Sequence, residues 1–184
     1  QAQKNELEAA GQRRQQLLKR QADADKAAGL LQSEAQQVAA QLDEVALAEA
    51  RRVARPGGVV VAVGISRFAS LMDGLKRRIL DDEVFRPIVQ RDLESGQHRN
   101  PDVRARPEFF TTAYFHRPEE LRDEAIEAGL VDVSLLAVEG PSWMVEDPAD
   151  LDNQLFAARA VESEPSLMGA TSHIMVIGYR PVAS

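Results

Sequence analysis

Residues 48–65 read AEARRVARPGGVVVAVGI, and this stretch decides the fold of the larger part of the chain. Residues 48–55 are mostly good helix formers. Pro56 and the two glycines that follow it end this helix and turn the chain. The run Val59–Ile65 is apolar on both faces and rich in β-branched residues, which is typical of a central strand covered on both sides. With two further apolar runs, this predicts an α/β domain with a three-stranded mixed sheet, formed by Val59–Ile65, Val131–Val138 and His173–Tyr179.

Helical patterns separate these strands. The first is expected in two pieces, broken at Asp81-Asp82 or at Pro87. The second begins with proline and acidic residues, which suit a first helical turn, and ends at Gly129. The pattern predicts helices over residues 71–93, 118–129 and 150–162, and a polar loop over residues 95–101.

Residues 1–45 form a different kind of sequence. The first fifty residues contain ten Gln and thirteen Ala but no Pro and no aromatic residue, which predicts a polar helix. A thin, Ala-rich stripe with a seven-residue spacing indicates a weak coiled coil, a hairpin broken near Gly29, or a helix lying on the next domain. We therefore expect a coiled-coil-like segment that mediates homo-oligomerisation or binds a helical partner, although a solvated helix with no partner explains the same pattern. The apolar stripe consists of Ala10, Leu17, Ala24, Leu31, Val38 and Val45.

Charge and composition exclude several classes of function. The net charge is −7, and the residues after position 55 carry a balance of −8, which disfavours binding to nucleic acid. The chain has no cysteine, so it holds neither a disulfide nor a thiolate metal site, which suits a cytoplasmic protein. No apolar run approaches the roughly 20 residues that span a bilayer. A small-molecule substrate fits this composition best.

Several motifs, in order, resemble one family. Residues 48–58 followed by a Val-rich strand are similar to the helix and fifth strand of small-molecule class I S-adenosylmethionine-dependent methyltransferases. Residues 110–121 resemble the start of that family's next helix, and Glu127–Leu130 resembles its "EAGF" helix end. Residues 136–141 and the closing strand resemble its final antiparallel hairpin. The resemblance implies that residues 46–184 are the C-terminal part of a Rossmann-like methyltransferase domain, with a helical insert at about 66–115 that lies over the substrate.

The resemblance also implies S-adenosyl-L-methionine as cofactor, but the cofactor motif is missing. The family binds it with a turn patterned like D-x-G-x-G-x-G after a strand, and residues 1–45 contain only Gly11 and Gly29. We therefore expect cofactor-binding residues to be absent and catalysis by this chain alone to be doubtful. Two hypotheses remain open: a truncated methyltransferase of small molecules, and a non-catalytic remnant with a helical arm for oligomerisation or partner binding.

Candidate site residues come from the insert and the strand ends. His98 is a candidate general base, because imidazole titrates near neutral pH, although an exposed loop histidine is the simpler interpretation. Arg67 follows the first strand, at the edge where open α/β sheets bind ligands, and could bind a carboxylate. Tyr114 and Trp143 are candidate walls of a substrate pocket. His116 and His173 are expected to be structural, and no metal ligands are expected.

Overall fold

The computed structural model describes residues 11–24, 26–27, 30, 46–145 and 150–182. The chain divides into two compact units, Gln1–Gln41 and Leu42–Ser184. In the first unit residues 11–24 are helical, as the composition predicts. The predicted break at Gly29 and the stripe positions Ala10, Leu31, Val38 and Val45 lie outside the described residues, so the coiled coil stays a prediction.

The second unit begins with the stretch that opened the sequence analysis. Residues 46–53 are helical, and the helix ends just before the Pro-Gly-Gly turn, as predicted. The turn needs Gly57 because its φ is +71°, a conformation that side chains disfavour. The Arg180 guanidinium from the end of the chain donates to the carbonyl oxygens of Arg52 and Ala54, 2.8 and 2.7 Å away. These two hydrogen bonds fix the end of the helix beside the last strand.

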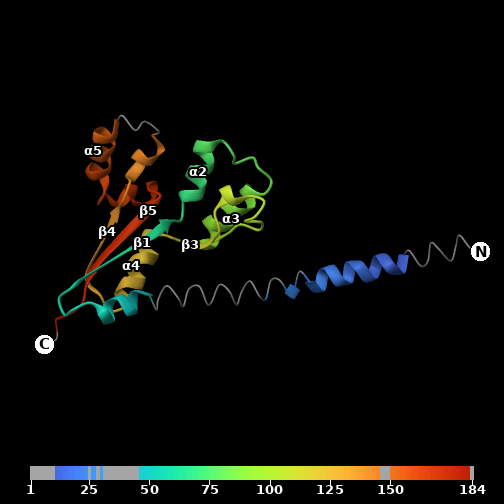
Figure 1. Ribbon diagram of the computed structural model, residues 1–184, viewed down its shortest axis with the longest axis horizontal. Coiled ribbons are helices and arrows are strands. Elements are labelled where there is room, and N and C mark those ends of the chain that lie inside the picture. The colour runs from blue at the N-terminus through green and yellow to red at the C-terminus, as the bar shows by residue number, and fades with distance from the viewer. Residues whose placement is uncertain (1–10, 25, 28–29, 31–45, 146–149, 183–184) are drawn as a thin grey trace, which may run out of the picture. The chain divides into compact units, whose positions relative to one another are not determined.

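The sheet is mixed and has five strands, in the order β2-β3-β1-β5-β4 (Figure 1). The last strand, β5, pairs antiparallel with both β1 and β4, which confirms the predicted pairing of the final two strands. The predicted number of three strands is wrong, because β3 pairs parallel with β1 and β2 pairs antiparallel with β3. The five strands are β1 (Val59–Ser66), β2 (Gln97–Arg99), β3 (Thr112–His116), β4 (Val131–Ala137) and β5 (His173–Tyr179).

The helices lie close to their predicted ranges, but the prediction of a polar loop over residues 95–101 is wrong. That segment contains strand β2, which turns inward at Gly96 and pairs with β3. The helical region before it is broken around Asp82, whose Oδ1 accepts hydrogen bonds from the backbone N–H groups of Val84 and Phe85. The helices are α2 (Ala69–Arg77), α3 (Phe85–Ser95), α4 (Pro118–Glu127) and α5 (Leu151–Val161).

The two faces of the sheet differ. One face is covered by α4 and by the helix over residues 46–53. Val59, Val61 and Val63 on the other face of β1 are 52–54% exposed, so the expected covering of both faces is not seen in the described part of the chain. On its open edge β1 is paired with β3 only at Ile65 and Ser66. The covered face buries one continuous core that includes Leu47, Val60, Leu121, Ala125, Ile174 and Val176.

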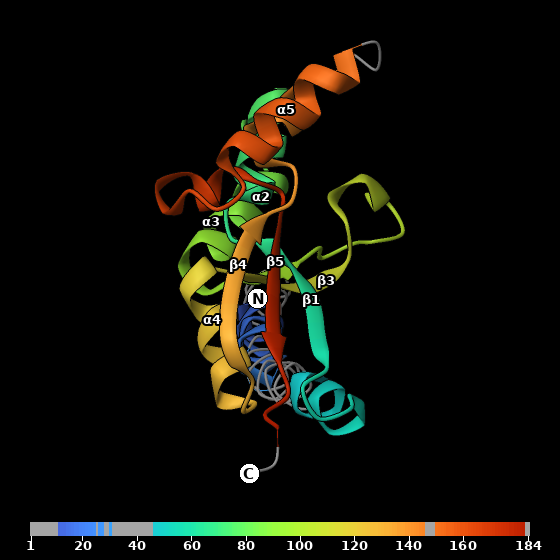
Figure 2. The same ribbon diagram turned by 90° about the vertical axis from the view of Figure 1, so that its left-hand side faces the viewer.

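The insert has a small core of its own, formed by Phe85, Ile88, Val89 and Phe109. Helices α2 and α3 lie beyond the carboxyl end of β1, at the same end of the sheet as α5 (Figure 2). The second unit therefore has two apolar cores, one under the sheet and one inside the insert. The space between the insert and the end of the sheet holds the candidate site.

Candidate functional site

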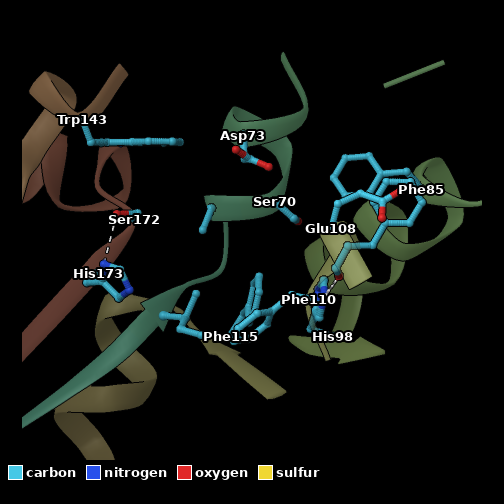
Figure 3. A pocket seen from close by; sticks show the side chains of 13 residues that line it. Ser70, Asp73, Phe85, His98, Glu108, Phe110, Phe115, Trp143, Ser172 and His173 are labelled. Atoms are coloured by element: carbon cyan, nitrogen blue, oxygen red, sulfur yellow. Dashed lines mark hydrogen bonds between the residues drawn. The ribbon is translucent and has the colours of Figure 1, made fainter. Parts of the chain in front are cut away.

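A pocket of about 260 Å³ lies where the insert meets the carboxyl end of β1 and the start of β5 (Figure 3). Its walls come from α2, from the 3₁₀ helix η1 (Pro107–Phe109), from β3 and from the 3₁₀ helix η2 (Gly140–Met144). The volume exceeds the roughly 150 Å³ of an apolar cavity that binds benzene. Most of the lining is apolar, and five of the lining residues carry large aromatic rings: Phe85, Phe109, Phe110, Phe115 and Trp143.

The charged residues of the lining are already paired. Asp73 accepts from Arg77 at 3.0 Å, and Glu108 accepts from Arg106 at 2.7 Å. The Arg106 hydrogen bond is the main cause that holds the pKa of Glu108 below its ordinary value. None of the described lining residues is Lys or Arg, and both lining carboxylates already have an arginine partner.

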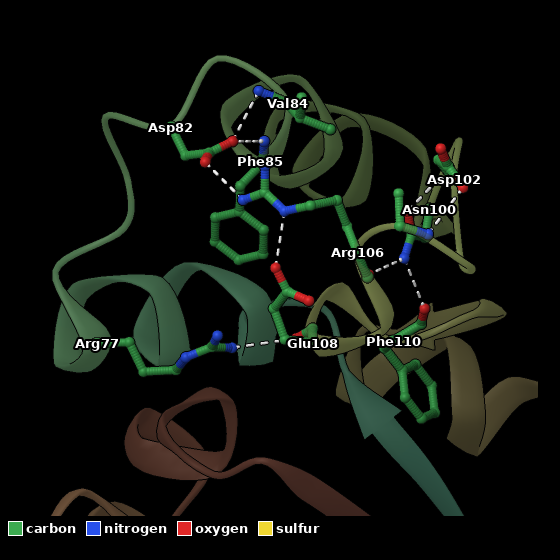
Figure 4. Close-up of polar contacts among 10 residues, drawn as sticks. Arg77, Asp82, Val84, Phe85, Asn100, Asp102, Arg106, Glu108 and Phe110 are labelled. Atoms are coloured by element: carbon green, nitrogen blue, oxygen red, sulfur yellow. Dashed lines mark hydrogen bonds and ion pairs between the residues drawn. The ribbon is translucent and has the colours of Figure 1, made fainter.

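Arg106 also positions the η1 wall of the pocket (Figure 4). Its guanidinium bridges Glu108 to Asp82, which precedes α3 by three residues: Nε donates to Glu108 Oε1 and Nη2 to Asp82 Oδ2, each at 2.7 Å. Its backbone carbonyl and that of Phe110 both accept hydrogen bonds from the Asn100 side-chain amide, at 2.6 and 2.9 Å. These contacts fix the backbone that carries Glu108, Phe109 and Phe110 into the pocket.

His98 lines the pocket but has no free nitrogen. The ring is 2% exposed, with Nδ1 2.9 Å from Asp92 Oδ2 and Nε2 donating to the Phe109 carbonyl at 2.9 Å. It stacks on the Phe115 ring, with centroids 4.6 Å apart and planes 4° from parallel. His98 therefore lies in a buried strand rather than in the exposed polar loop that the sequence predicted, and both of its nitrogens already bond to the protein.

A second histidine–carboxylate pair lies at the opposite wall. His173 Nδ1 is 2.6 Å from Glu139 Oε1, and the other oxygen of Glu139 accepts from Thr171 Oγ1 at 2.8 Å and from the His173 N–H at 3.1 Å. The His173 side chain is 46% exposed, and its Nε2 has no hydrogen-bond partner among the described residues. Figure 3 shows this nitrogen on the side of the ring that faces the pocket.

Glu139 is held in its charged form. Burial opposes that charge, but hydrogen bonds from His173, Thr171 and Ser172 outweigh burial and lower the pKa of Glu139 below its ordinary 4.5. The tautomer with the proton on Nδ1 donates that hydrogen to Glu139 Oε1 and presents Nε2, which faces the pocket, as a hydrogen-bond acceptor.

Arg67 and Tyr114 do not line the pocket. Arg67 is 2% exposed, and its guanidinium donates to the Phe115 carbonyl at 2.7 Å and to Glu120 at 2.6 Å. It also donates to the Tyr114 hydroxyl at 3.1 Å. Burial, and then the nearby Glu120 charge, raise the pKa of Tyr114. These residues join the end of β1 to β3 and α4 instead of facing a ligand.

Trp143 is the one residue of the predicted substrate-binding set that the pocket contains. Its indole N–H donates to the Ala170 carbonyl at 3.3 Å. His116 is 7% exposed, and its Nε2 lies 3.3 Å from Glu124 at an angle that makes no hydrogen bond. The structure thus brings together Trp143 and His98 from the sequence prediction, and it separates Arg67 and Tyr114 from them.

The sequence reasoning missed the His173–Glu139 pair. The signal was present in the antiparallel pairing that was predicted for the last two strands. The observed register aligns Ala137 with Ile174, which places the residue after the end of β4 opposite the start of β5. Extending that pairing by two residues brings Glu139 to the neighbourhood of His173.

No protein-family model matches this chain, and no curated protein matches its sequence. Within the described ranges, no helix is both long and apolar enough to cross a bilayer. The same residues contain no group of three or more His, Asp or Glu side chains that could hold a metal ion.

Proposed function

We propose that residues 46–184 form the substrate-binding half of a class I S-adenosylmethionine-dependent methyltransferase that acts on a small molecule. The observation that carries the proposal is the aromatic pocket between the insert and the carboxyl end of β1. The resemblance assigns the insert after this strand to substrate binding, and open α/β sheets bind ligands at the carboxyl ends of their strands. A pocket at this position agrees with the ligand-binding edge of a Rossmann-like fold.

The order of elements supports the same proposal. A helix that ends at Arg-Pro-Gly-Gly leads into β1, an insert follows, and α4 ends at Gly129 before β4. The chain closes with the antiparallel pair of β4 and β5. These are the pieces on which the resemblance rests, in the order that it requires.

The residues present do not fit the cofactor. The sequence contains no D-x-G-x-G-x-G pattern, and no glycine lines the pocket. Backbone without side chains is what lets a chain approach a nucleotide-like ligand closely. This chain therefore supplies the substrate side of the proposed site and lacks the pattern that holds the cofactor.

Binding of small aromatic molecules tests the pocket directly. The only tryptophan of the chain is Trp143 in the pocket wall, so its fluorescence reports occupancy. We expect neutral substituted benzenes to change Trp143 emission in a saturable way. An Ala69→Phe substitution, which fills the pocket from α2, should abolish that change. An Ala160→Phe substitution on the exposed side of α5 is the matched control and should leave it intact.

Two results would contradict the proposal. Equal responses in the wild type and in the Ala69→Phe variant would mean that Trp143 does not report a bound molecule in this pocket. Micromolar binding of S-adenosylhomocysteine to this chain, measured by calorimetry, would contradict the conclusion that its residues do not fit the cofactor.

A further inference from the structure

We infer that the pocket binds an uncharged aromatic molecule that carries a hydroxyl group, and that this hydroxyl donates a hydrogen bond to Nε2 of His173. The inference rests on the proposed function of the pocket and adds the class of its ligand. It follows from the lining, from the paired charges and from the His173 ring nitrogen Nε2, which has no hydrogen-bond partner among the described residues.

The aromatic lining selects a flat ring. Phe110 and Phe115 lie on the insert side of the pocket and Trp143 lies across from them (Figure 3). Aromatic rings favour offset-stacked or edge-to-face contacts with another ring, which add to the gain from burying apolar surface. The volume of about 260 Å³ leaves room for a substituted single ring.

The charges of the lining select a neutral ligand. An acid would meet Asp73 and Glu108, and none of the described lining residues is a Lys or Arg that could balance its charge. An amine would compete with Arg77 and Arg106, whose guanidinium groups already bond to these two carboxylates at 3.0 and 2.7 Å. Burial of an unbalanced charge costs far more than burial of a neutral polar group.

Nε2 of His173 selects a hydrogen-bond donor. Glu139 and its partners fix the ring through Nδ1, so Nε2 is held in place before a ligand arrives. A phenol-type hydroxyl is a good donor and can lie in the plane of a ring that packs between the aromatic walls. His98 cannot serve in this way, because its Nε2 already donates to Phe109.

A second polar group of the pocket is unsatisfied. Ser70, in the first turn of α2, is 7% exposed, and its hydroxyl has no hydrogen-bond partner among the described residues. A buried hydroxyl without a partner costs free energy in the empty pocket. A polar substituent that reaches α2 would relieve this cost, so the ligand class includes rings with a second polar group across from the first.

The test compares matched probes on the full chain. The probes are 4-ethylphenol, 4-ethylanisole, 4-ethylbenzoate and 4-ethylbenzylammonium, titrated by calorimetry. One net hydrogen bond predicts that the phenol binds roughly threefold to tenfold tighter than the anisole, which has no donor. The two charged probes should bind more weakly than the phenol. In His173→Phe the preference for phenol over anisole should fall to about one, with anisole binding retained as proof of an intact pocket.

A spectroscopic measurement separates the hydrogen bond from a change in packing. In the chain labelled with ¹⁵N-histidine, the phenol should shift the Nε2 resonance of His173, and the anisole should leave it in place. Equal affinities for phenol and anisole in the wild type, or tightest binding of the ammonium probe, would overturn the inference but leave the proposed function intact. Failure of all four probes to bind would overturn both.

Discussion

The pocket is flanked by two histidine–carboxylate pairs that use the same atoms in different ways. In both, Nδ1 contacts a carboxylate oxygen, at 2.9 Å for His98 with Asp92 and at 2.6 Å for His173 with Glu139. The first pair is 2% and 0% exposed and the second is 46% and 29% exposed. The first pair also gives its Nε2 to a backbone carbonyl, whereas the second leaves Nε2 without a partner in the described residues.

This difference indicates that the hydrogen bonding of the other ring nitrogen, Nε2, determines the role of a histidine–carboxylate pair. Both ring nitrogens of His98 contact groups of the protein and so connect β2 with α3 and η1. His98 is therefore a structural link inside the insert. In His173 the contact of Nδ1 with Glu139 orients the ring, and Nε2 is the atom that we propose binds a ligand. A carboxylate that fixes one ring nitrogen is common to buried histidines and to reactive ones, and therefore does not distinguish them.

The largest expected effect tests the structural role of the first pair. Asp92→Ala leaves the His98 ring buried without its carboxylate, so it should lower the free energy of unfolding by about 3–5 kcal/mol. Asp81→Ala is the matched control, because the Asp81 side chain is fully exposed, and it should change stability by less than about 0.5 kcal/mol. Urea denaturation followed by far-UV circular dichroism measures both. A loss below about 1 kcal/mol for Asp92→Ala would remove the distinction between the two pairs.

A smaller effect tests the turn that brings His98 inward. Gly96 has a φ of +74°, and a Cβ at this position would lie 2.5 Å from the Phe115 carbonyl oxygen. Gly96→Ala should therefore cost about 2–3 kcal/mol through backbone strain and the clash together. Gly57→Ala separates these causes, since Gly57 has a similar φ of +71° but its Cβ would meet only a side-chain atom at 3.4 Å. Similar losses in the two variants, measured by thermal unfolding, would mean that the close approach of β2 to β3 contributes nothing.

The sequence predicts the main strands and helices around the two histidine–carboxylate pairs better than it predicts the contacts of the histidines. The apolar run at β1, the proline-started helix α4 and the strand β5 each carry a local signal, and each lies where the pattern predicts it. Strand β2 carries none, because its three residues, Gln97–Arg99, are polar and become a strand only by pairing with β3. The role of His98 was unpredictable for the same reason, since its two acceptors, Asp92 and the Phe109 carbonyl, meet it only through tertiary packing.

Arg67 is a second residue whose contacts could not be predicted from the sequence. Its place after β1, at the ligand-binding edge of the sheet, agrees with the sequence prediction, but the direction of its side chain does not follow from that place. The guanidinium turns away from the pocket toward Glu120, whose carboxylate also accepts from the backbone N–H of Arg117 at the start of α4. Periodicity identifies which residues lie at an edge, whereas partners distant in sequence decide which of them face a ligand.

The smallest expected effect concerns the second pair and its dependence on pH. Because the pKa of Glu139 lies below 4.5 in the folded chain, its charged form contributes stability that is fully present above pH 4.5 and is lost as the pH falls through the folded value. Glu139→Gln keeps the hydrogen-bond acceptor and removes the charge, so the variant should be less stable than the wild type at pH 7. The difference should stay under about 1 kcal/mol, since both side chains of the pair are partly exposed to solvent.

Urea titrations from pH 7 to pH 3 measure this difference directly. The stability of the wild type should approach that of Glu139→Gln as the pH falls below 4.5, because the wild-type carboxyl then takes up the proton that removes its charge. A difference that is constant over this range would mean that Glu139 acts through shape alone and does not hold the His173 ring by charge. The charge of Glu139 would then contribute nothing to the fixed orientation of the His173 ring, on which the proposed role of Nε2 depends.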